Sequence, residues 1–184
     1  MSNGLSRNTS VSHIKVVSSL DQALFDALVT ALPSNSTLRH LDLCWRGSYD
    51  NAHLSPVFLA LGKNTGVKEV SLDAFGSMDE SLCTAMNDGL EMNTTLESLE
   101  LRLVRLTDDN SDLWCRALSF LRTNKTLKSL MLRENRSSPT ESYAGAAFRK
   151  DMVAMLQENA SLERLCILTS AHSKIVIKAE DYLA

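Results

Sequence analysis

Aliphatic residues recur along the chain in one phrase of nine positions, each copy beginning with asparagine and carrying aliphatics at its fourth, seventh and ninth positions. Copies begin at Asn8, Asn35, Asn64, Asn93, Asn124 and Asn159, which places them 27 to 35 residues apart. A period of this length is typical of solenoid repeat proteins. The last two aliphatics lie two positions apart, so they point to the same face of a strand. Each copy therefore predicts one short strand.

Apolar residues also recur at helical spacing ahead of every asparagine after the first. Three and seven positions upstream stand Leu32 and Leu28, Leu61 and Val57, Leu90 and Met86, Leu121 and Ala117, Leu156 and Met152. A further apolar residue extends each stripe, namely Leu24, Leu54, Leu82, Leu113 or Phe148. Each unit thus reads as strand, loop and helix. Neither element can bury its apolar face alone, so the units are predicted to stack as a parallel sheet covered by helices.

The repeated asparagine is predicted to end each helix, because asparagine tolerates the left-handed conformation of helix ends and its amide can bond nearby backbone groups. Glycosylation is the alternative, since sequons begin at Asn8, Asn35, Asn93, Asn124, Asn135 and Asn159. The start of the sequence lacks the pattern of a secretory signal. We therefore expect a cytoplasmic chain whose sequons are not used.

Leu-x-x-Leu-x-Leu at this period, with a helix in every unit, resembles the ribonuclease-inhibitor type of leucine-rich repeat over roughly residues 8–170. The resemblance implies an α/β horseshoe, with parallel strands on the concave side and helices on the convex side, that binds proteins and is not an enzyme. We expect a single domain over residues 1–184. The family's asparagine three positions after the third aliphatic is kept only at Asn135, so the turns that leave the strands are predicted to be irregular.

Composition and charge narrow the possible partners. The sequence is 44% hydrophobic with a formal net charge of -3, which gives no broad basic surface for nucleic acid. No apolar run approaches the roughly 20 residues that cross a bilayer, so no membrane contact is expected. The four cysteines form no C-x-x-C pair, and neither a metal site nor any cofactor is predicted.

The outward strand positions are where a protein partner would be met. We predict partner-binding roles for His40, Asp42, Trp45, Glu69, Asp73, Glu100, Arg102 and Arg133. Glu69, Asp73, Glu97 and Glu100 form an acidic middle between basic groups, a pattern that suits a specific protein surface. Trp45 is either an interface anchor, as tryptophans often are, or is packed under its loop. Trp114 is predicted to lie in the core.

Two hints of chemistry have simpler interpretations. His13 and His40 occupy equivalent positions on neighbouring strands and could hold a metal with Glu69, but no local ligand motif supports them. We interpret them as solvated histidines. Gly62 and Lys63 faintly resemble a phosphate loop, but Val57 stands where its first glycine would be, and the repeat places this segment at a helix end.

The ends of the repeat array suggest a second kind of function. Ile175, Val176 and Ile177 could form a closing strand, so residues 171–184 are predicted to be a C-terminal cap. The alternative is that a terminal repeat pairs with a second copy or with a longer array. The leading hypothesis is a non-catalytic interaction module that grips a protein with its concave face and adjacent loops. The other hypothesis is a structural unit that self-associates through its ends.

Overall fold

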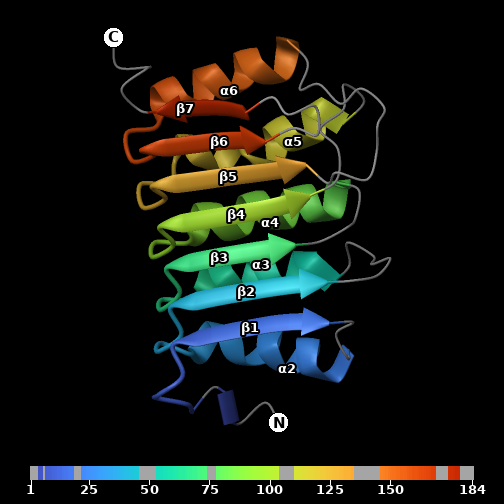
Figure 1. Ribbon diagram of the computed structural model, residues 1–184, viewed down its shortest axis with the longest axis vertical. Helices are drawn as coiled ribbons and strands as arrows, with labels where there is room; N and C mark the ends of the chain where they lie inside the picture. Colours follow the sequence, from blue (N-terminus) through green and yellow to red (C-terminus); the bar gives the residue numbers. More distant parts are fainter. Residues whose placement is uncertain are drawn as a thin grey trace.

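Seven strands form a single sheet in chain order in the computed structural model, which describes residues 4–5, 7–18, 22–45, 53–73, 78–103, 110–134, 146–168 and 174–178 (Figure 1). The strands are β1 (His13–Ser18), β2 (His40–Trp45), β3 (Glu69–Asp73), β4 (Ser98–Leu103), β5 (Ser129–Glu134), β6 (Arg164–Leu168) and β7 (Lys174–Lys178). β1 to β6 are parallel, and β7 pairs with β6 in the antiparallel direction. The six predicted strands and the predicted closing strand are therefore confirmed.

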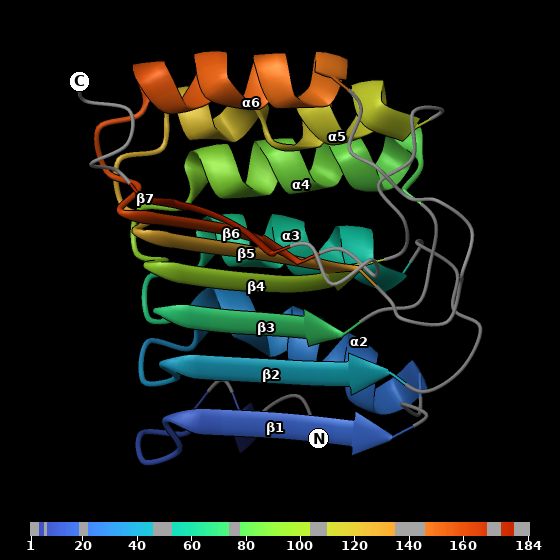
Figure 2. The same cartoon turned by 45° about the horizontal axis from the view of Figure 1, so that its top comes forward.

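The helices lie in one layer behind the sheet (Figure 2). They are α2 (Gln22–Ala31), α3 (Leu54–Lys63), α4 (Glu80–Met92), α5 (Ser111–Ala117) and α6 (Ala146–Glu158), with 3₁₀ turns at Leu32–Ser34 and Ser119–Arg122. None of the helices in the described part of the chain is long and apolar enough to cross a membrane. The opposite face of the sheet carries no helix among the described residues, and we call it the open face.

The sheet register places equivalent residues of successive phrases side by side, as with Ile14, Leu41 and Val70. The inward aliphatics of β2 to β6 are at most 4% exposed, so the core lies between the sheet and the helices. The two inner positions of every predicted helical stripe are buried. The outer position is wrong in α2: Leu24 is 45% exposed and Phe25 is buried in its place, because Phe25 keeps helical spacing with Leu28.

The repeated asparagines form a ladder that joins neighbouring units. The Asn64 Nδ2 donates to the Leu32 carbonyl at 2.6 Å and to the Asn35 carbonyl at 2.8 Å, both in the preceding unit. Its Oδ1 accepts from the backbone N–H groups of Gly66 and Val67. Amides that bond the preceding unit and the following turn recur at Asn35, Asn93, Asn124 and Asn159.

This ladder corrects the predicted conformation of the asparagines. Asn35, Asn64 and Asn93 have φ between -86° and -74° with ψ between 117° and 139°, so their backbones are extended and not left-handed. The side chain closes the turn by accepting the next N–H groups, and the backbone needs no unusual conformation. Most units have another residue at the position, three after the third aliphatic, where leucine-rich repeats of this type usually have asparagine. The asparagine ladder of this chain lies at the opposite end of the strands, where each strand begins.

The same geometry explains the periodic sequons. The hydroxyl two residues after the asparagine donates across the unit boundary, as from Thr37 Oγ1 to the Asn8 carbonyl at 2.8 Å. Asn35, Asn93 and Asn124 are at most 4% exposed, and their amide nitrogens are occupied as donors. The Asn-x-Ser/Thr pattern is thus a structural rung, and these amides are inaccessible to glycosylation in the folded chain.

Two glycines let α3 and α4 pack closely. A Cβ added at Gly89 would lie 2.1 Å from the carbonyl oxygen of Phe58, and one at Gly62 would lie 2.8 Å from the Gly89 oxygen. Real Cβ atoms do not approach backbone this closely, so only glycine fits at position 89 unless the helices separate. The spacing of these two central helices is therefore set by the absence of side chains.

Candidate functional site

The open face is built from the strand residues that alternate with the buried aliphatics. Three rows cross it: His13, His40, Glu69, Ser98, Ser129 and Arg164; then Lys15, Asp42, Ser71, Glu100, Met131 and Cys166; then Val17, Cys44, Asp73, Arg102, Arg133 and Leu168. Each row follows from the strand period of two. Cys166 has an outward position in its row but is buried, with 4% of its surface exposed.

A hollow of about 420 Å³ lies on the open face across β1 to β4. Six of the residues predicted to bind a partner line it, namely His40, Asp42, Glu69, Asp73, Glu100 and Arg102. Arg133 lies next to them on β5, with its Nη1 3.4 Å from the Glu100 Oε1. Trp45 ends β2, but its side chain falls outside the described residues, so its role as an anchor stays a prediction.

Ion pairs between neighbouring strands organise the charges of the hollow. The Arg102 guanidinium bridges two carboxylates, with Nη1 3.3 Å from the Asp73 Oδ2 and Nε 3.1 Å from the Glu100 Oε1. At the β1 end, the Lys15 Nζ lies 2.6 Å from the Asp42 Oδ2, and this hydrogen bond raises the pKa of Lys15. The predicted acidic middle is therefore interleaved with cations, which holds these side chains in defined positions.

Glu69 differs from the other carboxylates of the hollow because its neighbour is a histidine. Its Oε1 lies 3.3 Å from the His40 Nε2, and the His40 ring stacks on that of His13 with centroids 5.5 Å apart. Among the described residues, no group of three ligating side chains is arranged to hold a metal ion. The arrangement presents one exposed carboxylate beside two imidazoles on the N-terminal half of the face.

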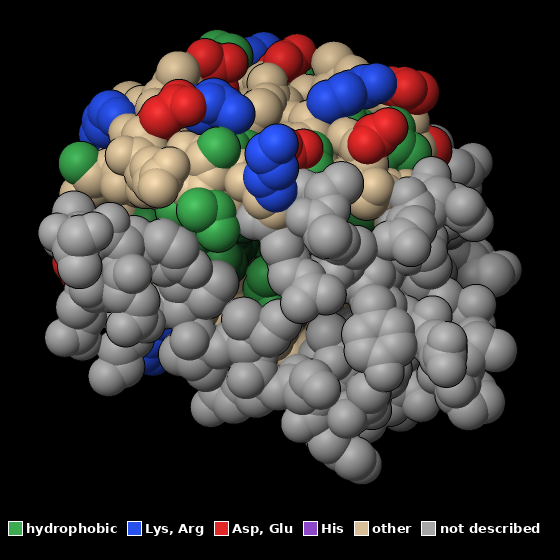
Figure 3. Space-filling view, turned by 90° about the horizontal axis from the view of Figure 1, so that it is seen from above, with side chains coloured by type: hydrophobic (Ala, Val, Ile, Leu, Met, Phe, Trp, Pro, Cys, Tyr) green, Lys and Arg blue, Asp and Glu red, His purple; other side chains and the backbone are tan. Residues whose placement is uncertain are grey.

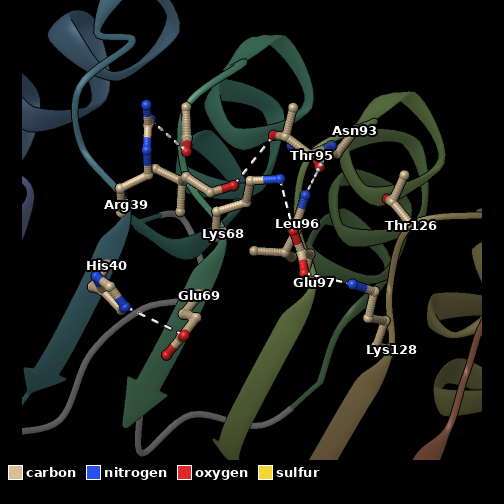
Figure 4. A network of polar contacts seen from close by, with 12 residues as sticks. Arg39, His40, Lys68, Glu69, Asn93, Thr95, Leu96, Glu97, Thr126 and Lys128 are labelled. Carbon is tan, nitrogen blue, oxygen red and sulfur yellow. Dashed lines mark hydrogen bonds and ion pairs between the residues drawn. The ribbon is translucent and has the colours of Figure 1, made fainter.

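A second set of charges lies where the strands begin (Figure 4). Glu97 is held between two lysines of the neighbouring units, with 2.7 Å to the Lys68 Nζ and 2.8 Å to the Lys128 Nζ. Both hydrogen bonds lower the pKa of Glu97 to about 2. Glu97 thus belongs to the charges at the start of the strands. The sequence pattern had placed it in the acidic middle of the open face. The signal in the sequence is the alternation of charge at the residues that precede β3, β4 and β5, which are Lys68, Glu97 and Lys128.

The Glu97 pair of contacts predicts a pH dependence of stability. A carboxylate whose pKa is lowered on folding stabilises the fold above its unfolded pKa near 4.5, and loses that contribution as the pH falls toward 2. Glu97→Gln should therefore lower the urea midpoint at pH 7, and the difference from wild type should vanish near pH 2. Glu91→Gln, at an exposed site on α4, is the control. A difference that stays constant with pH would contradict the prediction.

The open face offers hydrogen-bonding and charged groups for recognition, and its described residues include no thiol or hydroxyl with an imidazole base beside it. The Cys44 thiol donates to the Asp73 Oδ2 at 3.5 Å. His13 pairs with His40, four residues along the strand from Cys44, and so is not placed as its base. The face is suited to binding.

Comparison with known proteins tests the fold. No protein-family model matches the sequence, and a comparison with curated proteins finds no match. Among solved structures, Leiomodin-1 Actin-Binding Site 2 (ABS2) is similar, with a TM-score of 0.63 over 83% of this chain and 82% of that chain. The fold is leucine-rich-repeat-like. At 17% sequence identity the likeness concerns the fold, and it carries no residue of the site across.

Proposed function

We propose that this chain is a non-catalytic, cytoplasmic protein-binding module of the ribonuclease-inhibitor type that holds a partner on its open, concave face. The observation that carries the proposal is the hollow whose lining comes from four successive strands and brings six of the predicted binding residues together. A surface made by several strands of a rigid sheet is already ordered before binding. Complex formation therefore loses little free energy in ordering this surface.

The charge pattern supports a protein as the partner. Cations and anions pair between neighbouring strands, Lys15 with Asp42, Arg102 with Asp73 and Arg133 with Glu100. A phosphate backbone selects surfaces of one sign, whereas a folded protein can match a mosaic of both signs. The site residues His40, Asp42, Glu69, Asp73, Glu100, Arg102 and Arg133, with Trp45 at the adjacent loop, remain our proposed contacts.

Actin is the first partner to test. The similar structure is titled an actin-binding site, and the likeness covers most of both chains. We extend that partner to this chain as a hypothesis about the module, to be examined with purified actin before any wider search.

Reversing charge in the hollow should separate binding from folding. The triple variant Glu69→Lys, Asp73→Lys and Glu100→Lys should weaken capture of the partner by at least about tenfold, which corresponds to about 1.4 kcal/mol. The thermal midpoint should change little, because these ion pairs are partly exposed. Co-sedimentation with actin filaments and isothermal calorimetry measure the effect. The matched control carries Asp88→Lys and Glu91→Lys on the exposed side of α4.

A partner other than actin calls for a second measurement. A photo-crosslinking amino acid at Ser71, within the hollow, should capture the partner in a lysate, whereas one at the exposed Thr84 on α4 should not. Equal capture at both positions, or capture by the triple variant at wild-type strength, would place the binding surface elsewhere.

A further inference from the structure

The end of the solenoid at β1 is covered less than any internal boundary between units. Val11 is 37% exposed, although its equivalents are buried, namely Leu38, Val67, Leu96, Leu127 and Leu162, at 0% to 7%. Ile14 and Val16 are only partly buried, whereas the matching aliphatics of β2 to β6 are at most 4% exposed. This end therefore presents aliphatic side chains that every other unit hides behind its neighbour.

Asn8 occupies the first rung of the ladder with half of its hydrogen bonds made. Its Oδ1 accepts from the N–H groups of Ser10 at 2.9 Å and Val11 at 2.6 Å, as in the internal rungs. In those rungs the amide nitrogen donates to carbonyls of the preceding unit, as Asn64 does. Within the described residues the Asn8 amide nitrogen meets no such acceptor. Asn8 thus makes the turn half of an internal rung, and the described residues supply none of the acceptors that a preceding unit gives to the other rungs.

The backbone at this end also lacks, among the described residues, hydrogen bonds that the internal boundaries make. At the internal boundaries two successive N–H groups donate to one carbonyl of the preceding unit, as from Arg39 and His40 to Ser12. Among the described strands, β1 has a neighbour on one side only, which is β2. The side of β1 that faces away from β2 is an open parallel edge, and such an edge is a template for another strand.

We infer that this end binds a further leucine-rich repeat unit, stacked on β1 in parallel register. The occupant is defined by the internal boundaries: two main-chain carbonyls at a helix end for Asn8, a parallel strand for β1, and aliphatic side chains over Val11. Exposed core residues at a solenoid end are ordinarily covered by a terminal repeat, which is the role that this unit fills. The inference concerns a surface separate from the open face and goes beyond the proposed function.

The described residues at the other end of the array do not offer such a unit to a second copy. β6 is already paired with the antiparallel β7, so no parallel edge is presented there. Seen from that end, acidic and basic side chains gather over the helical layer (Figure 3). The exposed residues of α6 include Lys150, Asp151 and Glu158. The two ends are therefore not complementary, and a head-to-tail stack of identical chains is not the expected occupant.

The experiment supplies the unit and asks whether the end accepts it. In an extended chain, a copy of residues 28–63 replaces residues 1–7, so that the copied Leu61 takes the place of Leu5 ahead of Asn8. The copied strand should pair with β1, and amide exchange of the β1 N–H groups should slow at least tenfold. Asn8→Ala should lower the urea midpoint of the extended chain more than that of the natural chain, because only the extended chain offers acceptors to the Asn8 amide nitrogen. The matched control extension carries Leu41→Asp and Leu43→Asp in the copied segment.

Three results would overturn the inference. The first is an extension that leaves β1 exchange unchanged, and the second is an Asn8→Ala effect of equal size in both chains. The third is a natural chain that light scattering shows to be a dimer and that Val11→Lys makes monomeric, because a second copy would then occupy this end. The open-face variants change none of these groups, so failure here is distinguishable from failure of the proposed function.

Discussion

Replacing Asn64 with aspartate should destabilise the fold by about 3 to 5 kcal/mol at pH 7, with urea unfolding as the measurement. Asn64 is 2% exposed, and its amide nitrogen points at two carbonyl oxygens of the preceding unit. Aspartate has the same shape but no donor, so a buried carboxylate would face the Leu32 and Asn35 carbonyls without compensation. The acceptor half of the rung, to Gly66 and Val67, would remain.

The loss should depend on pH in a defined direction. Burial beside two carbonyl oxygens raises the pKa of the introduced carboxyl above its unfolded value. A group with a raised acid pKa costs least below the unfolded value near 4 and most above the folded value, so the deficit against wild type should grow from about pH 4 to pH 7. Below that range the protonated acid can donate to one of the two carbonyls.

Two companion variants give this experiment its contrast. Asn64→Ala removes both halves of the rung and should lose stability to a similar extent at either pH, since no charge is introduced. Asn8→Asp should have little effect, because the Asn8 amide has no acceptor among the described residues. An Asn64→Asp deficit that is the same at pH 4 and pH 7, or that matches that of Asn8→Asp, would refute the ladder as a source of stability.

The second large effect is expected at Gly89, where alanine should cost about 3 kcal/mol in the free energy of unfolding. At an exposed helical site the same change stabilises by about 0.5 to 1 kcal/mol, because glycine is a poor helix former. Here the new Cβ would lie 2.1 Å from the Phe58 oxygen and 2.6 Å from its carbonyl carbon. Both contacts are with backbone, so no side chain can rotate away and α3 must move from α4.

Thermal and urea unfolding of Gly89→Ala, compared with Asp88→Ala one residue earlier, measure this effect. Asp88 is exposed on the same helix, so its replacement should be close to neutral. If Gly89→Ala proved as stable as wild type, the close packing of α3 on α4 would be contradicted. A loss of stability confined to Gly89→Ala would show that the helix spacing is fixed by that glycine.

Sequence pattern predicted the parts of this fold that depend on local periodicity. The strand positions of all six phrases, the closing strand and the inner stripe of every helix are confirmed, because a period of two or of about 3.6 is visible in the chain itself. The outer position of the α2 stripe was wrong: Leu24 was assigned to it, but both Leu24 and Phe25 keep helical spacing with Leu28, and packing buries Phe25.

The repeat also predicted which candidate site residues would share a face, since equal positions in equal phrases must align in a parallel sheet. His40, Asp42, Glu69, Asp73, Glu100 and Arg102 line one hollow as a consequence. Their pairing was not predictable. Whether Arg102 meets Asp73 or Glu100 depends on side-chain rotamers across a strand spacing, and the structure has it meet both.

By itself, then, the sequence determined a stack of strand and helix units and the register in which they align, because both follow from the repetition of short local patterns. The tertiary structure decided the contacts between units. The Asn64 amide reaches residues 29 and 32 positions away, the Gly89 contact joins two helices, and Glu97 binds lysines of both neighbours. These interactions join residues that are remote in sequence, and only the stacking of units brings their atoms within bonding distance.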